Sequence, residues 1–293
     1  MSGTISEFAP AKINLSLRVG PPREDGYHPL DSLVTFADWG DMITVRDEVA
    51  LLMTMGGEAS RDLQEEENNL VLRAARLLQD RAGIDKGALI HLQKEIPVAA
   101  GLGGGSADAA ATLRALNQLW EIDWELDKLA ELAIELGADV PACVYSRPLH
   151  MRGIGEAIEL IGKFPSLTAV IINPGVPVAT GEVFAAYDET EPAPLKPGRA
   201  LGGHILDWLV REPNHLERPA MRLEPKIKRA LDWLKRQDGA ELARMSGSGA
   251  SCFALFKDEE KAERAADSYD GFAIEVGLAG ILDGEITYAD ELA

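Results

Sequence analysis

The stretch that decides the fold runs from residue 97 to residue 111 and reads PVAAGLGGGSADAAA. Four glycines fall within residues 101–105, and alanines dominate the run that follows them. Glycine loses more conformational entropy on folding than any other residue, so this cluster destabilises the chain unless the backbone geometry requires it. Residues 88–98 have the pattern of a strand, and residues 106–120 have that of a helix rich in small residues.

A strand, a glycine-rich turn and a helix in this order predict an anion site. The N–H groups at the start of the helix have no intrahelical partners, and the helix dipole adds partial positive charge. The stretch is not a Walker A loop, and the dinucleotide pattern G-x-G-x-x-G fails because position 106 is serine. A flexible loop or tight turn is the alternative. We expect a phosphate cradle, in which the Ser106 hydroxyl binds a phosphate or a metal ion.

The composition is that of an ordinary globular protein: of its 293 residues, 46% are hydrophobic and 26% are charged. The formal net charge of −19 argues against nucleic acid as the main partner, but it allows a small phosphorylated ligand. No apolar run reaches the roughly 18 residues of a membrane span, and no secretory leader is evident. We therefore expect a cytoplasmic protein with no membrane partner and with Cys143 and Cys252 reduced; a disulfide between them is the alternative.

Strand and helix patterns interleave along the whole chain, which predicts a mixed α and β fold. Helices are expected over residues 68–82, 124–137, 224–239 and 258–269, and strands over residues 12–20, 167–175 and 252–256. Residues 32–46 are expected to form two short strands around a turn at Gly40–Asp41. A domain boundary is expected within residues 150–165. The last 35 or so residues carry no informative motif.

The glycine stretch resembles the phosphate-binding motif of the GHMP kinases. Five further stretches occur in the order typical of one branch of that family, whose members phosphorylate a cytidyl-linked methylerythritol in non-mevalonate isoprenoid biosynthesis. They are PAKINLSL (10–17), DGYHPLDSL (25–33), NLVLRAARLL (69–78), LGADVP (136–141) and SGSGAS (246–251). The resemblance covers residues 10 to about 256, and its combination of motifs is more specific than the glycine loop alone.

The resemblance implies a two-domain α+β fold with the active site in a cleft. Residues 1–155 would form the nucleotide-binding α/β domain, and residues 156–293 a smaller ferredoxin-like α+β domain. The implied reaction moves the γ-phosphoryl group of ATP to the 2-hydroxyl of the substrate with the help of Mg²⁺, for which Ser106 is the candidate ligand. The expected oligomeric state is a monomer or a weak homodimer.

The resemblance also assigns roles to residues. Asp139 would orient or deprotonate the attacking hydroxyl, and Lys12 would lie beside it and keep the carboxylate ionised. Asn14 shares the strand face of Lys12 and would contact the substrate. Without the resemblance, Asp139 would be interpreted as a capping residue and Lys12 as a solvated lysine. The expected ATP contacts are Asn69, Leu70, Lys94, Pro97, Val98, Ala99, Ala100, Gly101, Leu102, Gly103, Gly104, Gly105, Ser106 and Ala107.

The resemblance assigns Tyr27 and His28 to a cytosine ring. The two side chains suit a flat ring, since one can stack on it and the other can hydrogen-bond its edge. Phe184 would be the second stacking face, although core packing explains it equally well. The remaining substrate contacts are expected at Thr180, Gly247 and Gly249. Asp108 puts a carboxylate in the first turn of the helix, where it either binds Mg²⁺ or faces away.

Two other functions remain open from the sequence. A homoserine- or mevalonate-type kinase would act on a small acyclic substrate that has no flat ring for Tyr27 and His28 to hold. A non-catalytic nucleotide-binding protein would have no need of the set Lys12, Asn14 and Asp139.

Overall fold

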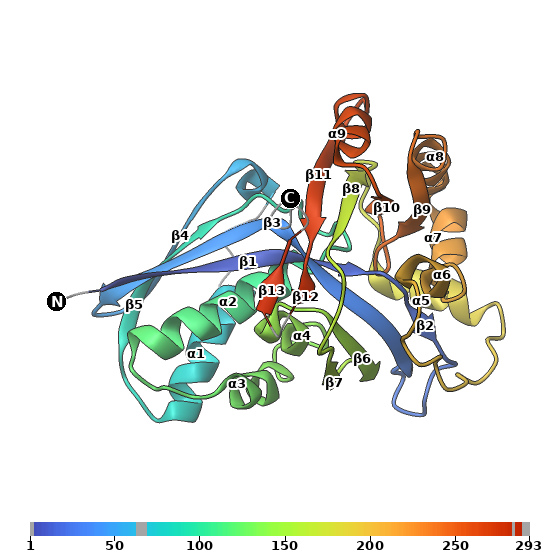
Figure 1. Cartoon of the computed structure of the whole chain (residues 1–293). Helices are drawn as coiled ribbons and strands as arrows, with labels where there is room; N and C mark the ends of the chain where they lie inside the picture. Colours follow the sequence, from blue (N-terminus) through green and yellow to red (C-terminus); the bar gives the residue numbers. More distant parts are fainter. Residues whose placement is uncertain (1–2, 63–68, 283–284, 289–293) are drawn as a thin grey trace. The chain divides into compact units, whose positions relative to one another are not determined.

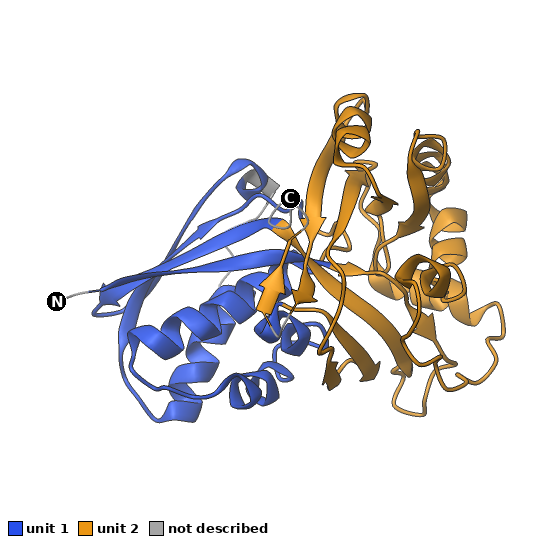
Figure 2. Cartoon of the chain, viewed as in Figure 1, with its two compact units in different colours: residues 1–12, 39–98, 103–146 blue, residues 13–38, 99–102, 147–293 orange. Residues whose placement is uncertain are grey.

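The computed structural model describes residues 3–62, 69–282 and 285–288. By the contacts within the chain, these residues form two compact units (Figure 2). Unit 1, in blue, contains residues 1–12, 39–98 and 103–146; unit 2, in orange, contains residues 13–38, 99–102 and 147–293. The boundary that we expect at residue 155 stays a prediction.

Unit 1 combines a sheet with helices that cover one of its faces (Figure 1). Strand β5 pairs with β4 in parallel and with the second half of β3 antiparallel, and β1 also pairs with β3. Its elements, of which β1 and β3 extend into the residues of unit 2, are β1 (Thr4–Asn14), β3 (Leu30–Glu48), β4 (Leu51–Gly56), the 3₁₀ helix η1 (Glu58–Asp62), α1 (Leu70–Ala82), β5 (Gly87–Gln93), α2 (Gly104–Leu119), α3 (Leu126–Ala133) and α4 (Val140–Tyr145).

Helix α1 begins and ends at residues that cap it, and helix α2 is composed of residues that pack closely. The Asn69 side chain accepts a hydrogen bond from the backbone N–H of Val71 and so caps the start of α1. Gly83, with φ of +67°, ends α1 in the left-handed conformation that glycine adopts freely. Residues 107–117 of α2 are almost all buried, and their many alanines let the helix pack closely. The helix expected over residues 68–82 is confirmed from residue 70; residue 68 lies outside the described residues.

The expected turn at Gly40–Asp41 is wrong, because β3 runs unbroken through both residues for 19 positions. A side chain at Gly40 would lie 2.4 Å from the carbonyl oxygen of Ala9 in β1. The glycine therefore allows β1 to approach β3 rather than allowing the chain to reverse. Asp41 is fully buried and hydrogen-bonded, so its turn-forming tendency is overridden by tertiary contacts.

Unit 2 is built on the antiparallel strand order β11–β8–β10–β9. Helix α8 contacts β9 and β10, and α9 contacts β8, β10 and β11 (Figure 1). The elements are β2 (Arg18–Val19), β6 (Leu149–Gly153), β7 (Ala157–Leu160), β8 (Leu167–Asn173), α5 (Thr180–Asp188), α6 (Ile205–Leu209), α7 (Glu217–Leu223), α8 (Pro225–Leu234), β9 (Ala240–Met245), β10 (Cys252–Phe256), α9 (Glu259–Asp267), β11 (Phe272–Leu278), β12 (Gly280–Leu282) and β13 (Glu285–Thr287).

The end of the chain contributes more to the fold than its sequence suggests. β11 pairs with β8 along its whole length and also with β3 at Leu278 and Ala37. Cys143 and Cys252 are both buried and free, as expected. Within the described ranges, no helix is both long enough and apolar enough to cross a bilayer.

Candidate functional site

Lys12 and Asp139 meet in unit 1, as predicted. The Lys12 ammonium donates a hydrogen bond of 3.0 Å to Oδ1 of Asp139. The lysine side chain is only 3% exposed, whereas the carboxylate is 43% exposed. Lys12 lies near the end of β1 rather than at the start of a strand, as its sequence context suggested. The pair therefore consists of a partly exposed carboxylate and a buried ammonium group that contacts it.

Asp139 occupies the N-cap position of α4, but its side chain makes no capping hydrogen bond there. Aspartate at an N-cap commonly accepts a hydrogen bond from the backbone N–H of the first turn. Here the carboxylate contacts Lys12 instead, 127 positions away in the sequence. This departure from the local preference indicates that the side chain serves something other than the helix.

Arg114 in α2, which the sequence analysis did not single out, connects the two elements that carry this pair. Its guanidinium donates to the carbonyl oxygens of Cys143 at 2.9 Å and Val144 at 3.3 Å in α4. It also donates to Phe8 O at 2.7 Å and to Glu7 Oε2 at 2.8 Å in β1. Arg114 therefore fixes β1 and α4 relative to each other. The sequence signal that could have identified this role is a single arginine within a helix composed mostly of small and apolar residues.

The glycines at the start of α2 make room for two lysine side chains. A Cβ atom at Gly103, where φ is +64°, would lie 3.1 Å from carbon atoms of Lys12. A Cβ at Gly104 would lie 2.9 Å from the ammonium nitrogen of Lys94. The backbone N–H groups at the N-terminus of α2 are thereby brought close to the base of the Lys12–Asp139 pair. A phosphate cradle requires a backbone approach of this kind.

Lys94 has a different role from the one expected, because it does not present its ammonium to a ligand. Its side chain is 3% exposed and contacts Asp41, and it donates to Oδ2 of Asp108 at 2.9 Å. Asp41 in turn accepts from the backbone N–H groups of Glu95 at 2.6 Å and Ile96 at 2.8 Å. We call Lys94, Asp41 and Asp108 the buried cluster. It ties the residues before the glycine loop to the helix after it.

Asp108 faces inward, to this cluster. Burial raises the pKa of its carboxyl well above the ordinary range, and the Lys94 charge only partly opposes that effect. Its Oδ1 is buried without a hydrogen-bond partner among the described residues. Burial also raises the pKa of the Cys143 thiol to about 12, so this cysteine stays protonated at neutral pH.

The first half of the glycine loop, residues 99–102, belongs to unit 2, where it contacts the SGSGAS stretch at residues 246–251, which we call the second glycine turn. The N–H of Ser251 donates to the Ala100 carbonyl at 2.9 Å, and a Cβ at Gly101 would lie 2.4 Å from the carbonyl oxygen of Gly249. Gly247 and Gly249 both have positive φ. Two backbones touch here without intervening side chains, which accounts for the glycines in both motifs.

Asn14 lies in a buried polar network of unit 2. Its side-chain amide donates to the Ser32 hydroxyl at 2.8 Å, and its backbone N–H donates to the Ser246 hydroxyl at 3.2 Å. Asn214, which the sequence analysis missed, donates to the carbonyl oxygens of Met245 and Gly247, each at 2.8 Å. The second glycine turn is thus held from both sides.

The residues assigned to a flat ring gather in unit 2, around His28. Its imidazole lies 4.7 Å from the Phe184 ring, between centroids, at an interplanar angle of 40°. Its Nε2 contacts Oδ1 of Asp188 at 2.8 Å, a partner that the sequence did not indicate. The adjacent Tyr27 is 57% exposed, so its ring is available to a ligand. The Thr180 hydroxyl lies 2.9 Å from that of Ser248, in the second glycine turn.

The remaining predicted residues lie at or near the start of the two helices of unit 1. Asn69 and Leu70 begin α1, and a Cβ at Gly105 would lie 3.5 Å from a methyl carbon of Leu70. Ser106 is partly exposed in the first turn of α2, and Val98 is 40% exposed. Among the residues that the structure describes, no group of three or more His, Cys, Asp or Glu side chains could hold a metal ion.

Comparisons with known proteins agree with this geometry. The model of the GHMP kinases N terminal domain matches residues 69–147, and that of the GHMP kinases C terminal matches residues 199–273. A 4-diphosphocytidyl-2-C-methyl-D-erythritol kinase of Parvibaculum lavamentivorans is 45% identical over 291 residues, covering 96% of this chain and all of the relative. One of Rhizobium etli is 46% identical and covers 91% of each chain.

Solved structures show the same similarity. A crystal structure of 4-(cytidine 5'-diphospho)-2C-methyl-D-erythritol kinase superposes with a TM-score of 0.77 at 36% identity, covering 94% of this chain and 99% of the other. A homoserine kinase of Cytophaga hutchinsonii reaches a TM-score of 0.69 at 21% identity, with 97% of each chain covered, and shares the fold.

Proposed function

The chain belongs to the GHMP kinases, in the branch of the 4-diphosphocytidyl-2-C-methyl-D-erythritol kinases, and we propose that it transfers the γ-phosphoryl group of ATP to the 2-hydroxyl of that cytidyl-linked methylerythritol. Such a reaction belongs to the non-mevalonate route to isoprenoid precursors. The observation that carries the proposal is the contact of 3.0 Å between Lys12 and Asp139. The Lys12 side chain of this pair also packs against Gly103, at the start of α2.

Phosphoryl transfer depends mainly on positioning and on charge stabilisation, because its transition state is loose. In this proposal the N-terminus of α2 binds the phosphates of ATP through its backbone N–H groups. The half-exposed Asp139 carboxylate accepts a hydrogen bond from the substrate hydroxyl and orients it. Lys12 holds that carboxylate in place from its buried side.

ATP would arrive with Mg²⁺, which neutralises part of the charge on its phosphates when bound. Mg²⁺ keeps several waters and commonly takes its other ligands from phosphates and one or two side chains, so it does not need a cluster of carboxylates. The partly exposed Ser106 hydroxyl in the first turn of α2 suits that limited requirement. Asp108 does not, because it is 3% exposed and accepts from Lys94.

Substrate choice would depend on the cluster around His28. Phe184 on one side and the exposed Tyr27 offer aromatic faces to a planar base. The contact with Asp188 fixes the orientation of the imidazole and occupies Nε2, which leaves Nδ1 for the edge of the base. A homoserine- or mevalonate-type substrate would leave this cluster unused.

The test is to assay ATP-dependent phosphorylation of a panel of alcohols: the cytidyl-linked methylerythritol, methylerythritol phosphate without the cytidyl group, homoserine and mevalonate. We expect turnover of the first compound alone. Turnover of homoserine or mevalonate at a comparable rate would support the alternative kinase, and no turnover of any compound would support a binding protein.

The variant His28→Ala tests the cytosine assignment. We expect the KM for the cytidyl substrate to rise at least about tenfold, the effect of losing one good hydrogen bond and a ring contact. The KM for ATP should stay within about twofold, because the glycine loop is untouched. His91→Ala serves as the matched control, since that histidine lies in β5 of unit 1 and contacts Thr54. Equal changes in both KM values would contradict the assignment.

A further inference from the structure

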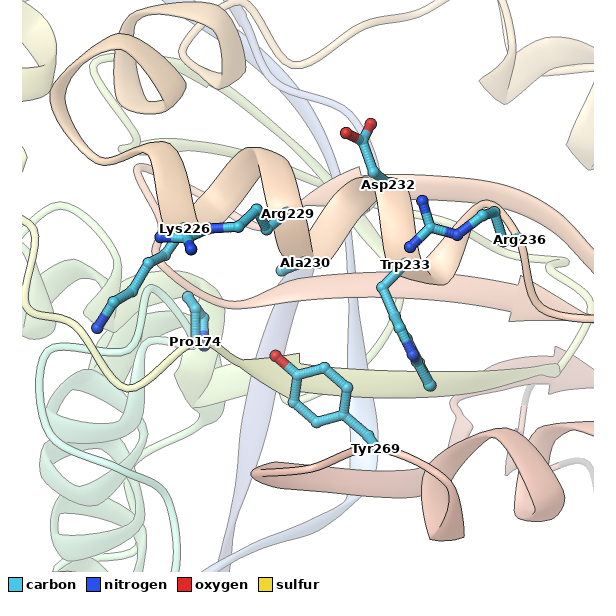
Figure 3. Close-up of a pocket in the computed structure, with 8 residues that line it drawn as sticks. All are labelled: Pro174, Lys226, Arg229, Ala230, Asp232, Trp233, Arg236 and Tyr269. Carbon is cyan, nitrogen blue, oxygen red and sulfur yellow. The ribbon is translucent and has the colours of Figure 1, made fainter.

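Unit 2 contains a pocket that none of the roles above uses. It has a volume of about 450 Å³ and is lined by Pro174, Lys226, Arg229, Ala230, Asp232, Trp233, Arg236 and Tyr269 (Figure 3). These residues come from the segment after β8, from α8 and the turn that follows it, and from the segment after α9. The volume is within the range of small-molecule sites, which is about 300–1,000 Å³.

Helix α8 supplies one continuous stripe of this pocket. Lys226, Arg229, Trp233 and Arg236 recur at spacings of three, four and three residues, which places them along one side of the helix. The opposite side is occupied by Ile227, Leu231 and Leu234, which are buried in the core of unit 2. Three cationic side chains and an indole therefore face the same space.

The positive charge of this stripe is unusual for the chain. Residues 226–236 hold five of the 29 lysines and arginines but only one of the 48 acidic residues, in a protein with a net charge of −19. The single acid, Asp232, accepts a hydrogen bond of 2.5 Å from Lys228, which lies outside the pocket lining. Within the described part of the chain, Lys226, Arg229 and Arg236 form no ion pair with a carboxylate.

Two aromatic side chains form a rigid wall of the pocket. Trp233 and Tyr269 pack edge to face with ring centroids 4.8 Å apart, and both rest against the hydrophobic core. This spacing is too close for a third ring to enter between them, so a ligand contacts their outer surfaces. The Tyr269 hydroxyl points toward Pro174 rather than toward Trp233 (Figure 3). It can therefore donate a hydrogen bond into the pocket.

We propose that this pocket is a second ligand site, which binds a small organic di- or triphosphate. The three exposed cations form no ion pair with a carboxylate among the described residues and so favour a ligand with more than one negative charge; arginine forks match phosphate oxygens bidentately. The indole and phenol offer contact area to the organic part of the ligand. The alternative is that these cations are only a solvated surface of the helix. That alternative does not account for the aromatic side chains of Trp233 and Tyr269 beside them or for the Tyr269 hydroxyl.

The test uses the full-length protein with ¹⁵N-labelled tryptophan, because the indole N–H of Trp233 reports on this pocket alone. Its resonance is assigned from the spectrum of Trp233→Phe. Inorganic pyrophosphate and ADP are titrated separately, since both can also bind the glycine loop and only a site-resolved signal distinguishes the two places. We expect a saturable shift of the Trp233 resonance below about 10 mM of each ligand, the range of weak but specific affinity.

Two double variants remove the same amount of charge from unit 2. R229Q/R236Q takes it from the pocket lining, and R211Q/K235Q takes it from exposed residues outside that lining. We expect the first to weaken pyrophosphate binding at Trp233 at least about tenfold and the second to change it less than about twofold. Tighter binding of ADP than of pyrophosphate would identify a nucleotide-like ligand, whereas equal binding would identify a phosphate group with any apolar tail.

The proposal is overturned if neither ligand shifts the Trp233 resonance, if both double variants weaken binding equally, or if citrate binds as tightly as pyrophosphate. The first result would mean no site, and the other two would mean general attraction of anions. The outcome is independent of the proposed kinase activity, because Asp139→Asn should leave the Trp233 titration unchanged.

Discussion

Unit 1 contains two buried lysines that each contact carboxylates, and the carboxylates differ in how exposed they are to solvent. Lys12 and Lys94 are each 3% exposed, and each lies beneath a glycine of the same loop. Their partners differ, because the Asp139 side chain is 43% exposed, whereas those of Asp41 and Asp108 are 0% and 4% exposed. One carboxylate can meet a substrate, and the other two cannot.

Exposure decides what each contact can contribute. The Lys12–Asp139 pair combines a buried cation with a 43% exposed carboxylate, so solvent screens the pair and it contributes less to stability than a pair buried on both sides. Breaking a fully buried pair costs about 3–5 kcal/mol, because a charge is left without compensation. The comparison assigns chemistry to the first contact and positioning of the glycine loop to the second, and the following changes test that division.

Asp139→Asn should have the largest effect. The amide cannot accept the hydroxyl proton, and we expect kcat to fall about a thousandfold, within the usual range for loss of acid–base assistance. The dissociation constant for ATP, measured by calorimetry, should barely change, and the melting temperature should fall less than in Asp41→Asn because water reaches the Asp139 side of the pair. Asp127→Asn, which removes an exposed contact with Tyr145 in the same unit, is the control. A fall in kcat of less than about tenfold would remove Asp139 from the chemistry.

Asp41→Asn should affect stability first. It leaves Lys94 with one carboxylate whose own pKa is raised by burial, and we expect the free energy of unfolding to fall by about 3 kcal/mol. Urea denaturation measures this loss. Asp238→Asn breaks an exposed pair with Lys261 and should change stability by less than about 0.5 kcal/mol. If the two variants were equally stable, the buried cluster would have no structural role.

Arg114→Lys should reduce stability and activity together, because Arg114 holds both elements that carry the open pair. Lysine keeps the charge but loses the fork that contacts four acceptors in β1 and α4. We expect a loss of about 2 kcal/mol in unfolding free energy and about a tenfold lower kcat. Arg81→Lys, in an exposed pair with Glu135, should leave both quantities nearly unchanged. Unaltered kcat in Arg114→Lys would show that β1 and α4 stay aligned without it.

Asp108→Asn should have the smallest effect, visible only as pH changes. The folded-state pKa of Asp108 lies above its ordinary value of 3.8, so the folded state keeps a proton that the unfolded chain releases. The resulting stabilisation is present in acid and is lost as pH rises through the raised pKa. Asparagine stays neutral, so the free energy of unfolding of the variant should rise relative to that of the parent as the pH increases above 3.8, until the raised pKa of Asp108 is passed. Urea titrations at three pH values measure this trend, and a flat difference would contradict the raised pKa.

Short-range patterns predicted much of this molecule. Helix α1 and strand β10 follow from spacing and capping, and the start of α2 follows from its glycines; the phosphate cradle at that start stays a prediction. The Lys12–Asp139 contact joins residues 127 positions apart, and only the family resemblance could place them together.

The missed features share a physical cause. Gly40 and Asp41 have the composition of a turn, but the approach of β1 and the backbone amides of Glu95 and Ile96 keep them in a strand. Asp188 and Asn214 have no local pattern, because their roles arise from partners far away in sequence. The sequence predicts a phosphate contact for Lys94, because nothing in the neighbouring sequence shows that the carboxylates of Asp41 and Asp108 lie within reach of its ammonium.

The interleaving of the two units along the chain has a consequence for biosynthesis. Unit 1 ends at residue 146, whereas residues 13–38 of unit 2 are translated early and then wait for their partners. β11, which pairs with β8 and with Ala37, emerges from the ribosome long after Ala37 does. No single cut in the gene can therefore release either unit whole, and a message truncated before β11 yields a chain in which β8 has an unpaired edge, the kind of surface that chaperones and proteases recognise.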